Sequence, residues 1–494
     1  MINFPNSHKS QPNSWLLQQE KLRPNEPAFY WLEECFTFRE LAHIVQSYAA
    51  YYLQQLPKNT KRVAIYSENS KDCYLTILAL WELGIEVQLI NTRLAKVEVQ
   101  NQLQDAQTSI VVSTQETPEF EDLVTIDFPD PQQLQRIEPC QWLDLGYDES
   151  MIASIMYTSG TTGKPKGVPQ TYVNHHASSL ATAKSLKILP NESWVCCVPL
   201  YHISGLAIIV RSLVLGISVR LYSKFSPEEI SDLLLSRQGT YISLVTKMLK
   251  KLIPFIPKEG YPSSLKMILL GGGPCEEILI ENCRQKQVPL MFSYGMTETC
   301  SQITALSPSK IETKKGSSGQ ALMGVSLKIN KEDSTDQSGE ILVKGPSIIR
   351  GYLNQVASDA WTEDGWFRTG DWGYLDHEND LYIVSRMSER IISGGETIYP
   401  GEIEAAFLSS EKVEEAVVVG RVDEEWGQTP ILFLKLKQMI TQEEMMGILK
   451  TIARYKHPTE IYQVSEIPKT ATGKPLKRVL MTEERVKYIE HQIK

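Results

Sequence analysis

The stretch that decides the fold is Tyr157-Thr158-Ser159-Gly160-Thr161-Thr162-Gly163-Lys164-Pro165-Lys166-Gly167-Val168. The apolar, partly β-branched run 151–157 leads into it and predicts a buried strand. Glycines let a backbone approach a ligand closely, and free N–H groups with hydroxyls form a concavity that suits phosphate oxygens. The P-loop of nucleoside triphosphatases is excluded, because that motif needs Ser or Thr directly after its lysine. The alternative interpretation is a flexible surface loop.

The composition is typical of a soluble protein with more than one domain, since 494 residues exceed what a single core usually organises. The formal net charge of −9 argues against nucleic acid or an anionic membrane as a partner. The N-terminus lacks a signal-peptide pattern, and the longest apolar stretch, 75–90, carries Glu82 and Glu86. We therefore expect a cytoplasmic protein without membrane insertion.

The 8 cysteines form no C-x-x-C pair, and neither they nor the 8 histidines have the spacing of a zinc site. Scattered thiols in a long chain indicate reduced, mostly buried residues.

Strands alternate with helices along the first 270 residues or so, which favours parallel sheets. Residues 10–60 are expected to be helical, with an amphipathic helix from Thr37 through Ala50 and another helix capped by Ser70. A polar, proline-containing linker is expected at 129–150, and a further helix at 174–186. The predicted strands are 62–66, 87–90, 109–112, 123–126, 194–198, 219–222 and 267–270.

From Gly339 onward, short strands and glycine turns indicate an antiparallel sheet or a small barrel. A polar break at 385–390 reads as a hinge, and the compact unit beyond it has the usual size of a domain. Its expected elements are helices at 402–408 and 442–455 and strands at 413–419 and 431–437. We predict an α/β fold: a large N-terminal domain (1–385) of parallel-type sheets flanked by helices plus a small barrel-like sheet, and a small α+β C-terminal domain (386–494).

Four later segments carry candidate site chemistry. The strand-to-glycine turn 269–274 suits a flat ring lying on backbone, and 291–299 offers Glu298 as a contact for nucleotide-bound Mg²⁺. A carboxylate such as Asp371 commonly accepts hydrogen bonds from ribose hydroxyls, and 468–474 presents Lys474 from a turn. Taken singly, Glu298 could cap a helix, Asp371 could be a turn residue and Lys474 a solvated charge.

In this order, the motifs resemble those of the adenylate-forming superfamily of acyl-CoA synthetases, firefly luciferase and peptide-synthetase adenylation domains. The resemblance extends from the N-terminal helix to Lys474. Within the superfamily, 89–94, 168–171, 199–206 and 295–302 most resemble the o-succinylbenzoate–CoA ligases of menaquinone biosynthesis.

The resemblance implies a two-step reaction: a carboxylate attacks MgATP to give an acyl-adenylate and pyrophosphate, and the thiol of coenzyme A then displaces AMP. ATP, Mg²⁺, coenzyme A and an aromatic keto-diacid are the implied ligands, and a homodimer is possible. The enzyme's work would be positioning and charge neutralisation.

The resemblance also implies roles for single residues. The leaving β,γ-phosphates would be held by Thr158, Ser159, Gly160, Thr161, Thr162 and Gly163, with positive charge from Lys164 and Lys166. Adenine would be surrounded by Gly271, Gly272, Gly273, Pro274, Ser293 and Tyr294. Gly295 would line both nucleotide and acid, Thr297 would contact the α-phosphate, and Glu298 would bind Mg²⁺.

Asp371, assisted by Arg386, would bind the ribose, and Lys474 would bridge the acyl carboxylate and the α-phosphate. Because Lys474 lies beyond the hinge, adenylation is expected to need domain closure. In the family, the mobile small domain then rotates and brings the loop of Gly394 and Gly395 to the pantetheine tunnel. The family's hinge position, usually Asp or Lys, is Ser388 here, and Ser385 replaces the common glycine.

The resemblance also implies residues of the acid pocket: His202 would be the aromatic gate of the family, and Arg211 is a candidate for binding the acid. An arginine after an apolar run needs an anionic partner, either the second carboxylate of o-succinylbenzoate or a structural ion pair. A hydrolase based on Ser204 is disfavoured, because the G-x-S-x-G elbow is missing.

The expected function is therefore ATP-dependent synthesis of o-succinylbenzoyl-CoA. The alternatives are another aryl or medium-chain acyl-CoA ligase, a carrier-protein-loading domain, and a catalytically dead acyl-nucleotide binder.

Overall fold

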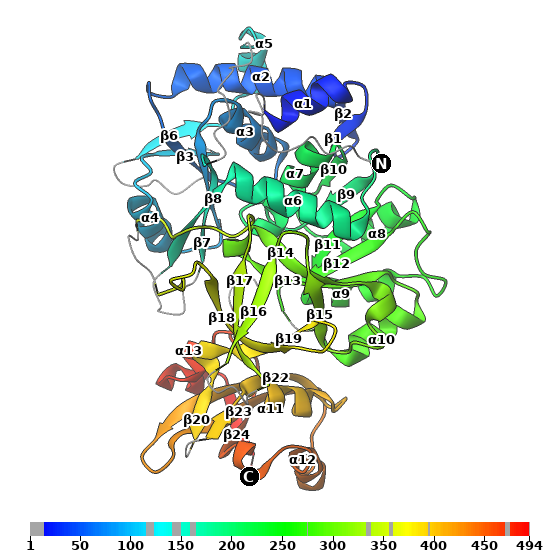
Figure 1. Cartoon of the computed structure of the whole chain (residues 1–494), viewed down its shortest axis with the longest axis vertical. Helices are drawn as coiled ribbons and strands as arrows, with labels where there is room; N and C mark the ends of the chain where they lie inside the picture. The colour runs from blue at the N-terminus through cyan, green and yellow to red at the C-terminus, as the bar shows by residue number, and fades with distance from the viewer. Residues whose placement is uncertain are drawn as a thin grey trace. The chain divides into compact units, whose positions relative to one another are not determined.

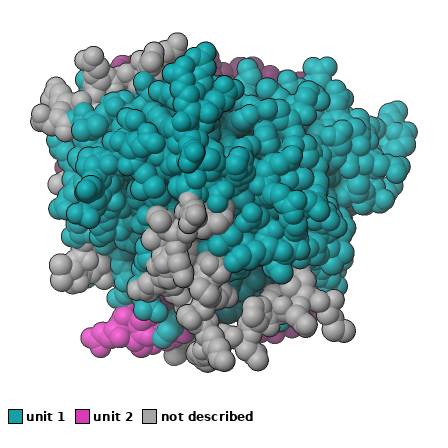
Figure 2. Space-filling view, turned by 90° about the horizontal axis from the view of Figure 1, so that it is seen from above, with its two compact units in different colours: residues 1–326, 344–361 teal, residues 327–343, 362–494 magenta. Residues whose placement is uncertain are grey.

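The computed structural model describes residues 14–114, 123–140, 150–158, 165–273, 275–331, 337–354, 359–393, 396–469 and 475–493. The chain divides into two compact units, Met1–Ser326 with Lys344–Trp361 (unit 1) and Leu327–Val343 with Thr362–Lys494 (unit 2), coloured teal and magenta in Figure 2. The functional boundary expected at 385/386 divides the chain differently and stays a prediction. Within the described ranges, no helix is long and apolar enough to cross a membrane.

The first sheet of unit 1 has the strand order β6-β5-β3-β4-β7-β8. Its strands up to β7 pair in parallel, whereas β7 and β8 form an antiparallel pair on either side of the glycine-rich motif. The predicted strands are confirmed in β3 (Arg62–Tyr66), β4 (Glu86–Ile90), β5 (Ile110–Ser113), β6 (Val124–Asp127) and β7 (Ile152–Thr158), with β8 at Lys166–Thr171.

The second sheet of unit 1 contains the order β15-β14-β13-β12-β11-β9-β10-β1-β2. Its strands are β1 (Pro27–Trp31), β2 (Glu34–Thr37), β9 (Ser193–Cys196), β10 (Ser218–Leu221), β11 (Tyr241–Val245), β12 (Met267–Gly271), β13 (Leu290–Met296), β14 (Ser301–Leu306) and β15 (Ser317–Ala321). The expectation of helix throughout 10–60 is wrong, because β1 and β2 form a hairpin there. β1 pairs in parallel with β10, a partner almost two hundred residues later, which no local pattern announces.

Helices pack between and around these sheets (Figure 1). Thr37 caps α2 (Phe38–Gln55) in a reciprocal box with Glu40, and Ser70 caps α3 (Lys71–Glu82), as predicted. One continuous core contains side chains of both sheets, of α2 and α3, and of α7 (Ile203–Leu215), which lies against α6 (Tyr172–Leu186). The other helices of unit 1 are α1 (Trp15–Leu22), α4 (Lys96–Asp105), α5 (Pro131–Gln135), α8 (Pro227–Leu235), α9 (Thr246–Leu252) and α10 (Glu277–Gln285).

The linker expected at 129–150 contains α5, a short helix whose first position is Pro131 and whose N-terminal N–H groups bond to Asp130. A proline therefore marks the start of a helix here and not an irregular segment. Residues 141–149 of that linker lie outside the described part of the chain.

Unit 2 begins with antiparallel strands, as predicted after residue 339: β16 (Ser326–Asn330), β17 (Gly339–Lys344), β18 (Phe367–Leu375) and β19 (Leu381–Arg386). Its second sheet has the order β21-β20-β23-β24-β25, with β22 paired to β23. These strands are β20 (Ile391–Ser393), β21 (Glu396–Ile398), β22 (Val413–Asp423), β23 (Gly427–Leu436), β24 (Glu460–Val464) and β25 (Ile489–Ile493). α11 (Pro400–Leu408) and α12 (Gln442–Leu449) complete a core with them, and α13 (Lys477–Leu480) follows β24.

The helix expected at 442–455 ends early, at Leu449. The hydroxyl of Thr451 donates to the carbonyl of Ile448, and a 3-10 turn, Arg454–Lys456, follows. This bond offers the backbone an alternative to further α-helix.

All eight cysteines are free thiols, and five of them are buried, in accordance with the prediction of reduced residues. Burial raises the pKa of the thiols of Cys73 and Cys197 to about 12, so neither is a ready nucleophile.

Candidate active site

The base of the phosphate-loop hairpin is tightly fixed in unit 1. Thr158 and Lys166 are register partners where β7 ends and β8 begins. A Cβ on Gly167 would lie 3.0 Å from Leu353 Cβ and 3.1 Å from the ring of Tyr157, and Leu353 N donates to Gly167 O at 2.8 Å. A side chain here would therefore require Leu353 or Tyr157 to move by a few tenths of an ångström, whereas glycine allows the close approach without a shift.

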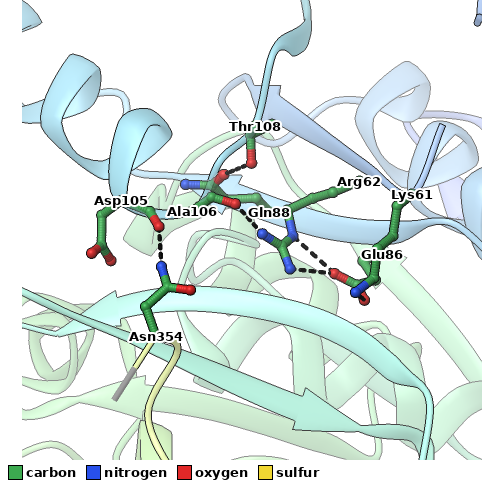
Figure 3. Close-up of polar contacts among 8 residues, drawn as sticks. All are labelled: Lys61, Arg62, Glu86, Gln88, Asp105, Ala106, Thr108 and Asn354. Carbon is green, nitrogen blue, oxygen red and sulfur yellow. Dashed lines mark hydrogen bonds and ion pairs between the residues drawn. The ribbon is translucent and has the colours of Figure 1, made fainter. Parts of the chain in front are cut away.

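The same base is held from α4. The phenol of Tyr157 donates to Asp105 Oδ2 at 2.6 Å. The amide of Asn354 donates to the backbone oxygen of Asp105 (Figure 3). Asp105 thus joins β7, the strand that leads into the loop, to the segment that contains Asn354.

Beside Thr158 lies the turn Thr297–Thr299, which follows β13. A hydrogen bond closes this turn, because Met296 N donates to Thr299 Oγ1 at 2.9 Å. Cys300 and Ser301 then adopt left-handed backbone angles, with φ of 50° and 94°. Such angles cost free energy in residues other than glycine and persist at functional sites where surrounding contacts enforce them.

Glu298 is the carboxylate of this turn, and it is buried. Its Oε1 accepts hydrogen bonds from Tyr352 Oη at 3.0 Å and from Thr158 Oγ1 at 3.5 Å. No lysine, arginine or histidine in the described ranges pairs with it. A buried carboxylate needs positive charge, and Mg²⁺ on a nucleotide takes one or two carboxylates plus phosphate oxygens, so this donor set fits such an ion.

Tyr352 was not identified from the sequence. Besides its bond to Glu298, its ring receives the ammonium of Lys166, whose Nζ lies 4.8 Å from the ring centroid. The only sequence signal was an aromatic residue after Arg350-Gly351, which has no distinguishing pattern.

The expected adenine platform is assembled by two parallel neighbours, β12 and β13. β12 ends at Gly271, Gly272 has φ of 87°, and a Cβ on Gly271 would lie 3.1 Å from Ser293 Oγ. Tyr294 is buried one residue further along β13. The structure therefore brings Gly271 next to Ser293, with Gly272 and Gly273 following in the turn.

Arg211 lies on α7 with only 1% of its surface exposed. Its Nη2 donates to Ser301 Oγ at 3.1 Å, and its guanidinium carbon lies 4.8 Å from the Trp194 ring centroid. Burial lowers the pKa of Arg211 to about 9. In the part of the chain that the structure describes, its Nε has no hydrogen-bond partner and no carboxylate pairs with it. A buried arginine in this state calls for an anion from outside.

Two more polar residues belong to the segments that carry Arg211 and Ser301. His202 is the N-cap residue of α7, half-buried, with its ring edge-on to Tyr201 at 4.9 Å. Gln302, next to Ser301, is buried, and both its amide atoms lack a partner among the described residues. Gln302 lies within the segment 295–302, and the sequence alone assigns it no role of its own.

In unit 2, the structure brings Asp371 and Arg386 together. They are cross-strand partners on β18 and β19, and Arg386 Nε lies 2.7 Å from Asp371 Oδ1. Asp371 is buried and follows Gly370, whose φ of 69° suits glycine.

The remaining predicted site residues lie outside the described part of the chain: Ser159, Gly160, Thr161, Thr162, Gly163, Lys164, Pro274, Gly394, Gly395, Lys474 and the side chain of Ser388.

Comparison with known proteins identifies the family. Residues 16–353 match the model of the AMP-binding enzyme family, and residues 402–474 match the model of the AMP-binding enzyme C-terminal domain. The chain belongs to the AMP-binding enzyme family. A member of that family, the 2-succinylbenzoate–CoA ligase of Enterococcus faecalis, is 45% identical over 484 residues, which cover 96% of this chain and 99% of the relative.

Solved AMP-binding enzymes have the same fold. The o-succinylbenzoate CoA synthetase of Bacillus subtilis in complex with the acyl-adenylate intermediate OSB-AMP is 36% identical, with a TM-score of 0.89 over 96% of this chain and 99% of that one. The same enzyme with ATP and a magnesium ion gives a TM-score of 0.88, over 96% and 100% of the two chains. These similarities confirm the predicted α/β fold and superfamily.

We predict that Gly295→Ala lowers the affinity for MgATP by at least about tenfold, equivalent to about 1.4 kcal/mol. The new Cβ would lie 2.1 Å from Ser301 O and 2.7 Å from Gln302 Cα, so the turn that carries Thr297 and Glu298 must shift. Isothermal titration with MgATP, alongside thermal unfolding, measures both effects.

The matched control is Gly260→Ala, whose Cβ would likewise meet a backbone oxygen, that of Lys286 at 2.3 Å. This turn carries no candidate site residue, so the control should lose stability and keep its MgATP affinity. Equal affinity loss in both variants would contradict a local effect at Gly295.

Proposed function

We propose that this chain is a ligase that joins 2-succinylbenzoate to coenzyme A at the expense of ATP, through an acyl-adenylate, with AMP and pyrophosphate as products. The near full-length similarity to ligases of this name supports the reaction and its co-substrates. A cytoplasmic location and a homodimer remain predictions.

The structural observation that carries the choice of acid is the buried guanidinium of Arg211. A keto-diacid has one carboxylate that becomes activated and a second that needs a counter-charge. Arg211 supplies that charge, and Ser301, held by it, supplies a hydroxyl. An ordinary aryl or medium-chain acid would leave the guanidinium buried and without an anion, which is costly.

The chemistry asks the protein for positioning, because a carboxylate becomes a good acyl donor only after its oxygen is joined to AMP. We propose that Thr158 and the rest of the glycine-rich loop hold the departing β,γ-phosphates, with Lys164 and Lys166 adding charge. Thr297 would contact the α-phosphate, Glu298 would hold the Mg²⁺ that travels with ATP, and His202 would close the acid pocket. Mg²⁺ would neutralise phosphate charge.

Asp371, oriented by its ion pair with Arg386, would accept hydrogen bonds from the ribose. Lys474 would bridge acid and α-phosphate in the first half-reaction, whereas Gly394 and Gly395 would serve coenzyme A in the second. The proposed division into domains 1–385 and 386–494, with Ser388 as the hinge, separates these two tasks.

We expect purified protein to form the CoA thioester from 2-succinylbenzoate, ATP and coenzyme A, detected by its mass. A panel of aryl and medium-chain acids, followed by AMP release, tests the runner-up function. Faster turnover of a panel acid than of 2-succinylbenzoate would reject the proposed acid. Absence of pyrophosphate release with every acid would indicate a catalytically dead binder.

We predict that Arg211→Ala raises the KM for 2-succinylbenzoate by about 10- to 100-fold, the effect of losing one hydrogen bond to a charged group. The KM for ATP should stay within about twofold of wild type, since Arg211 lies on the acid side. Steady-state kinetics with each substrate varied in turn give both constants.

Arg220→Ala is the control for Arg211, since Arg220 also stacks on an aromatic ring, with its guanidinium carbon 3.6 Å from the Tyr30 centroid. Its KM for the acid should not change. An unchanged KM in Arg211→Ala would show that Arg211 has only a structural role.

We predict that Lys474→Ala abolishes acyl-adenylate formation but spares the attack of coenzyme A on supplied acyl-adenylate. The reason is that its charge is needed only where carboxylate and α-phosphate meet. Lys469→Ala is the control from the same segment, because Lys469 is already paired with Glu415. Equal loss of both half-reactions in Lys474→Ala would contradict the proposal.

A further inference from the structure

A chain of buried polar side chains runs from α6 to the turn that carries Thr297. Ser154 on β7 and Gln170 on β8 are register partners, and neither is exposed. Ser154 Oγ lies 2.6 Å from Gln170 Oε1 and 2.8 Å from Nε2 of the buried His175. At the other end, Gln170 Nε2 donates to Thr297 O at 2.7 Å.

The direction of each hydrogen bond in this series of side chains is set by the last acceptor, the backbone carbonyl of Thr297. A backbone carbonyl can only accept, so Gln170 must turn its Nε2 toward Thr297 and its Oε1 toward Ser154. Ser154 must then donate its single proton to Gln170, and His175 must donate to Ser154. Burial lowers the pKa of His175 to about 3, so the ring is neutral and carries its proton on Nε2.

The receiving turn depends on bonds from outside it. Cys300 and Ser301 are in left-handed angles, and the carbonyls of the turn accept from three separate elements. Gln170 bonds to Thr297 O, Ile349 N bonds to Glu298 O at 3.0 Å, and Ser178 Oγ bonds to Cys300 O at 2.6 Å. Of these, only Gln170 belongs to the strand that leaves the phosphate loop.

We propose that Gln170 is a positioning residue that sets the turn of Thr297 and Glu298 against the phosphate-loop hairpin, with Ser154 and His175 fixing the orientation of its amide. The inference rests on the proposed function, in which Thr297 and Glu298 meet the α-phosphate and its cation. It adds a residue whose amide bonds to Ser154 and to Thr297 O, and that acts by holding this one peptide carbonyl.

A matched residue separates positioning from plain structural support. Gln88, on β4 of the same sheet, is also unexposed, and it also joins a hydroxyl to a backbone carbonyl. Its Oε1 accepts from Thr108 at 2.5 Å, and its Nε2 donates to Gln102 O at 3.3 Å. Figure 3 shows Gln88 and Thr108 beside Arg62 and Ala106. Gln88 supports α4, whose Asp105 bonds to Tyr157, and its two hydrogen bonds go to Thr108 and Gln102 and not to the turn of Thr297 and Glu298.

The experiment compares Gln170→Met with Gln88→Met, because methionine has nearly the same shape and no amide. Both variants should lose thermal stability to a similar extent. Only Gln170→Met should lower kcat/KM for MgATP in pyrophosphate release, by at least about tenfold, with the KM for the acid unchanged within about twofold.

Ser154→Ala provides a second variant that keeps Gln170 but frees its Oε1. It should reduce kcat/KM for MgATP less than Gln170→Met does, and it should add nothing in the Gln170→Met background, since both act through one chain. If Gln170→Met does not fold, the Ser154→Ala effect on MgATP, measured against Gln88→Met, decides the question.

Equal kinetic effects of Gln170→Met and Gln88→Met, or additive effects of the two chain variants, would overturn the inference. The acid used is whichever one the wild-type enzyme turns over best. If that acid is not 2-succinylbenzoate, the proposed substrate fails while the test of Gln170 still stands.

Discussion

A carboxylate that is removed from water costs free energy unless a positive charge balances it, and Glu298 in unit 1 is a buried carboxylate with no such partner among the described residues. Hydroxyls of Tyr352 and Thr158 stabilise the charge of Glu298 without neutralising it, because a hydroxyl contributes a dipole and not a charge. Among the described residues no cation pairs with Glu298, and in the proposed function the Mg²⁺ that accompanies ATP would supply the positive charge. The second buried charge is the guanidinium of Arg211, which pairs with no carboxylate among the described residues, and in the proposed function the second carboxylate of the acid would balance it.

These two buried charges are of opposite sign, yet they do not pair with each other. Ser301 and the left-handed backbone before it lie between the turn of Glu298 and the guanidinium. Had the two charges met, they would have formed an internal ion pair and neither would be available to a ligand. The left-handed residues Cys300 and Ser301 thus stand in the sequence between Glu298 and the hydroxyl that Arg211 contacts.

Much of the fold follows from local sequence. Strand β3 and the caps at Thr37 and Ser70 were predictable, because apolar runs, hydroxyl caps and capping boxes act within a few residues. The β1–β2 hairpin was not, since the strand that receives it, β10, comes much later in the chain. The helix inside the expected linker was missed because a proline there was read as a breaker when it occupies the first helical position.

The site divides in the same way. Glu298, Asp371 and Arg211 stand out in sequence by their charge and their place after strands or apolar runs. Gln170 and Tyr352 have no such mark, because their roles come from contacts across 127 and 54 residues. The position of Gln170 follows from the register of β7 with β8, and that of Tyr352 from its contact with Glu298. Partners of this kind are properties of the assembled sheet and are absent from any single segment.

At Ser301, the backbone conformation favours glycine, whereas the contact with Arg211 requires a hydroxyl side chain. At φ of 94°, glycine would relax the backbone and make the folded chain more stable, but it would remove the hydroxyl that Arg211 contacts. Selection for heat tolerance alone would therefore favour glycine here, and under the proposed role of Arg211 that change would weaken the discrimination between diacids and simpler acids. Under that role, the backbone strain at Ser301 would be a stability cost that accompanies selectivity for the acid.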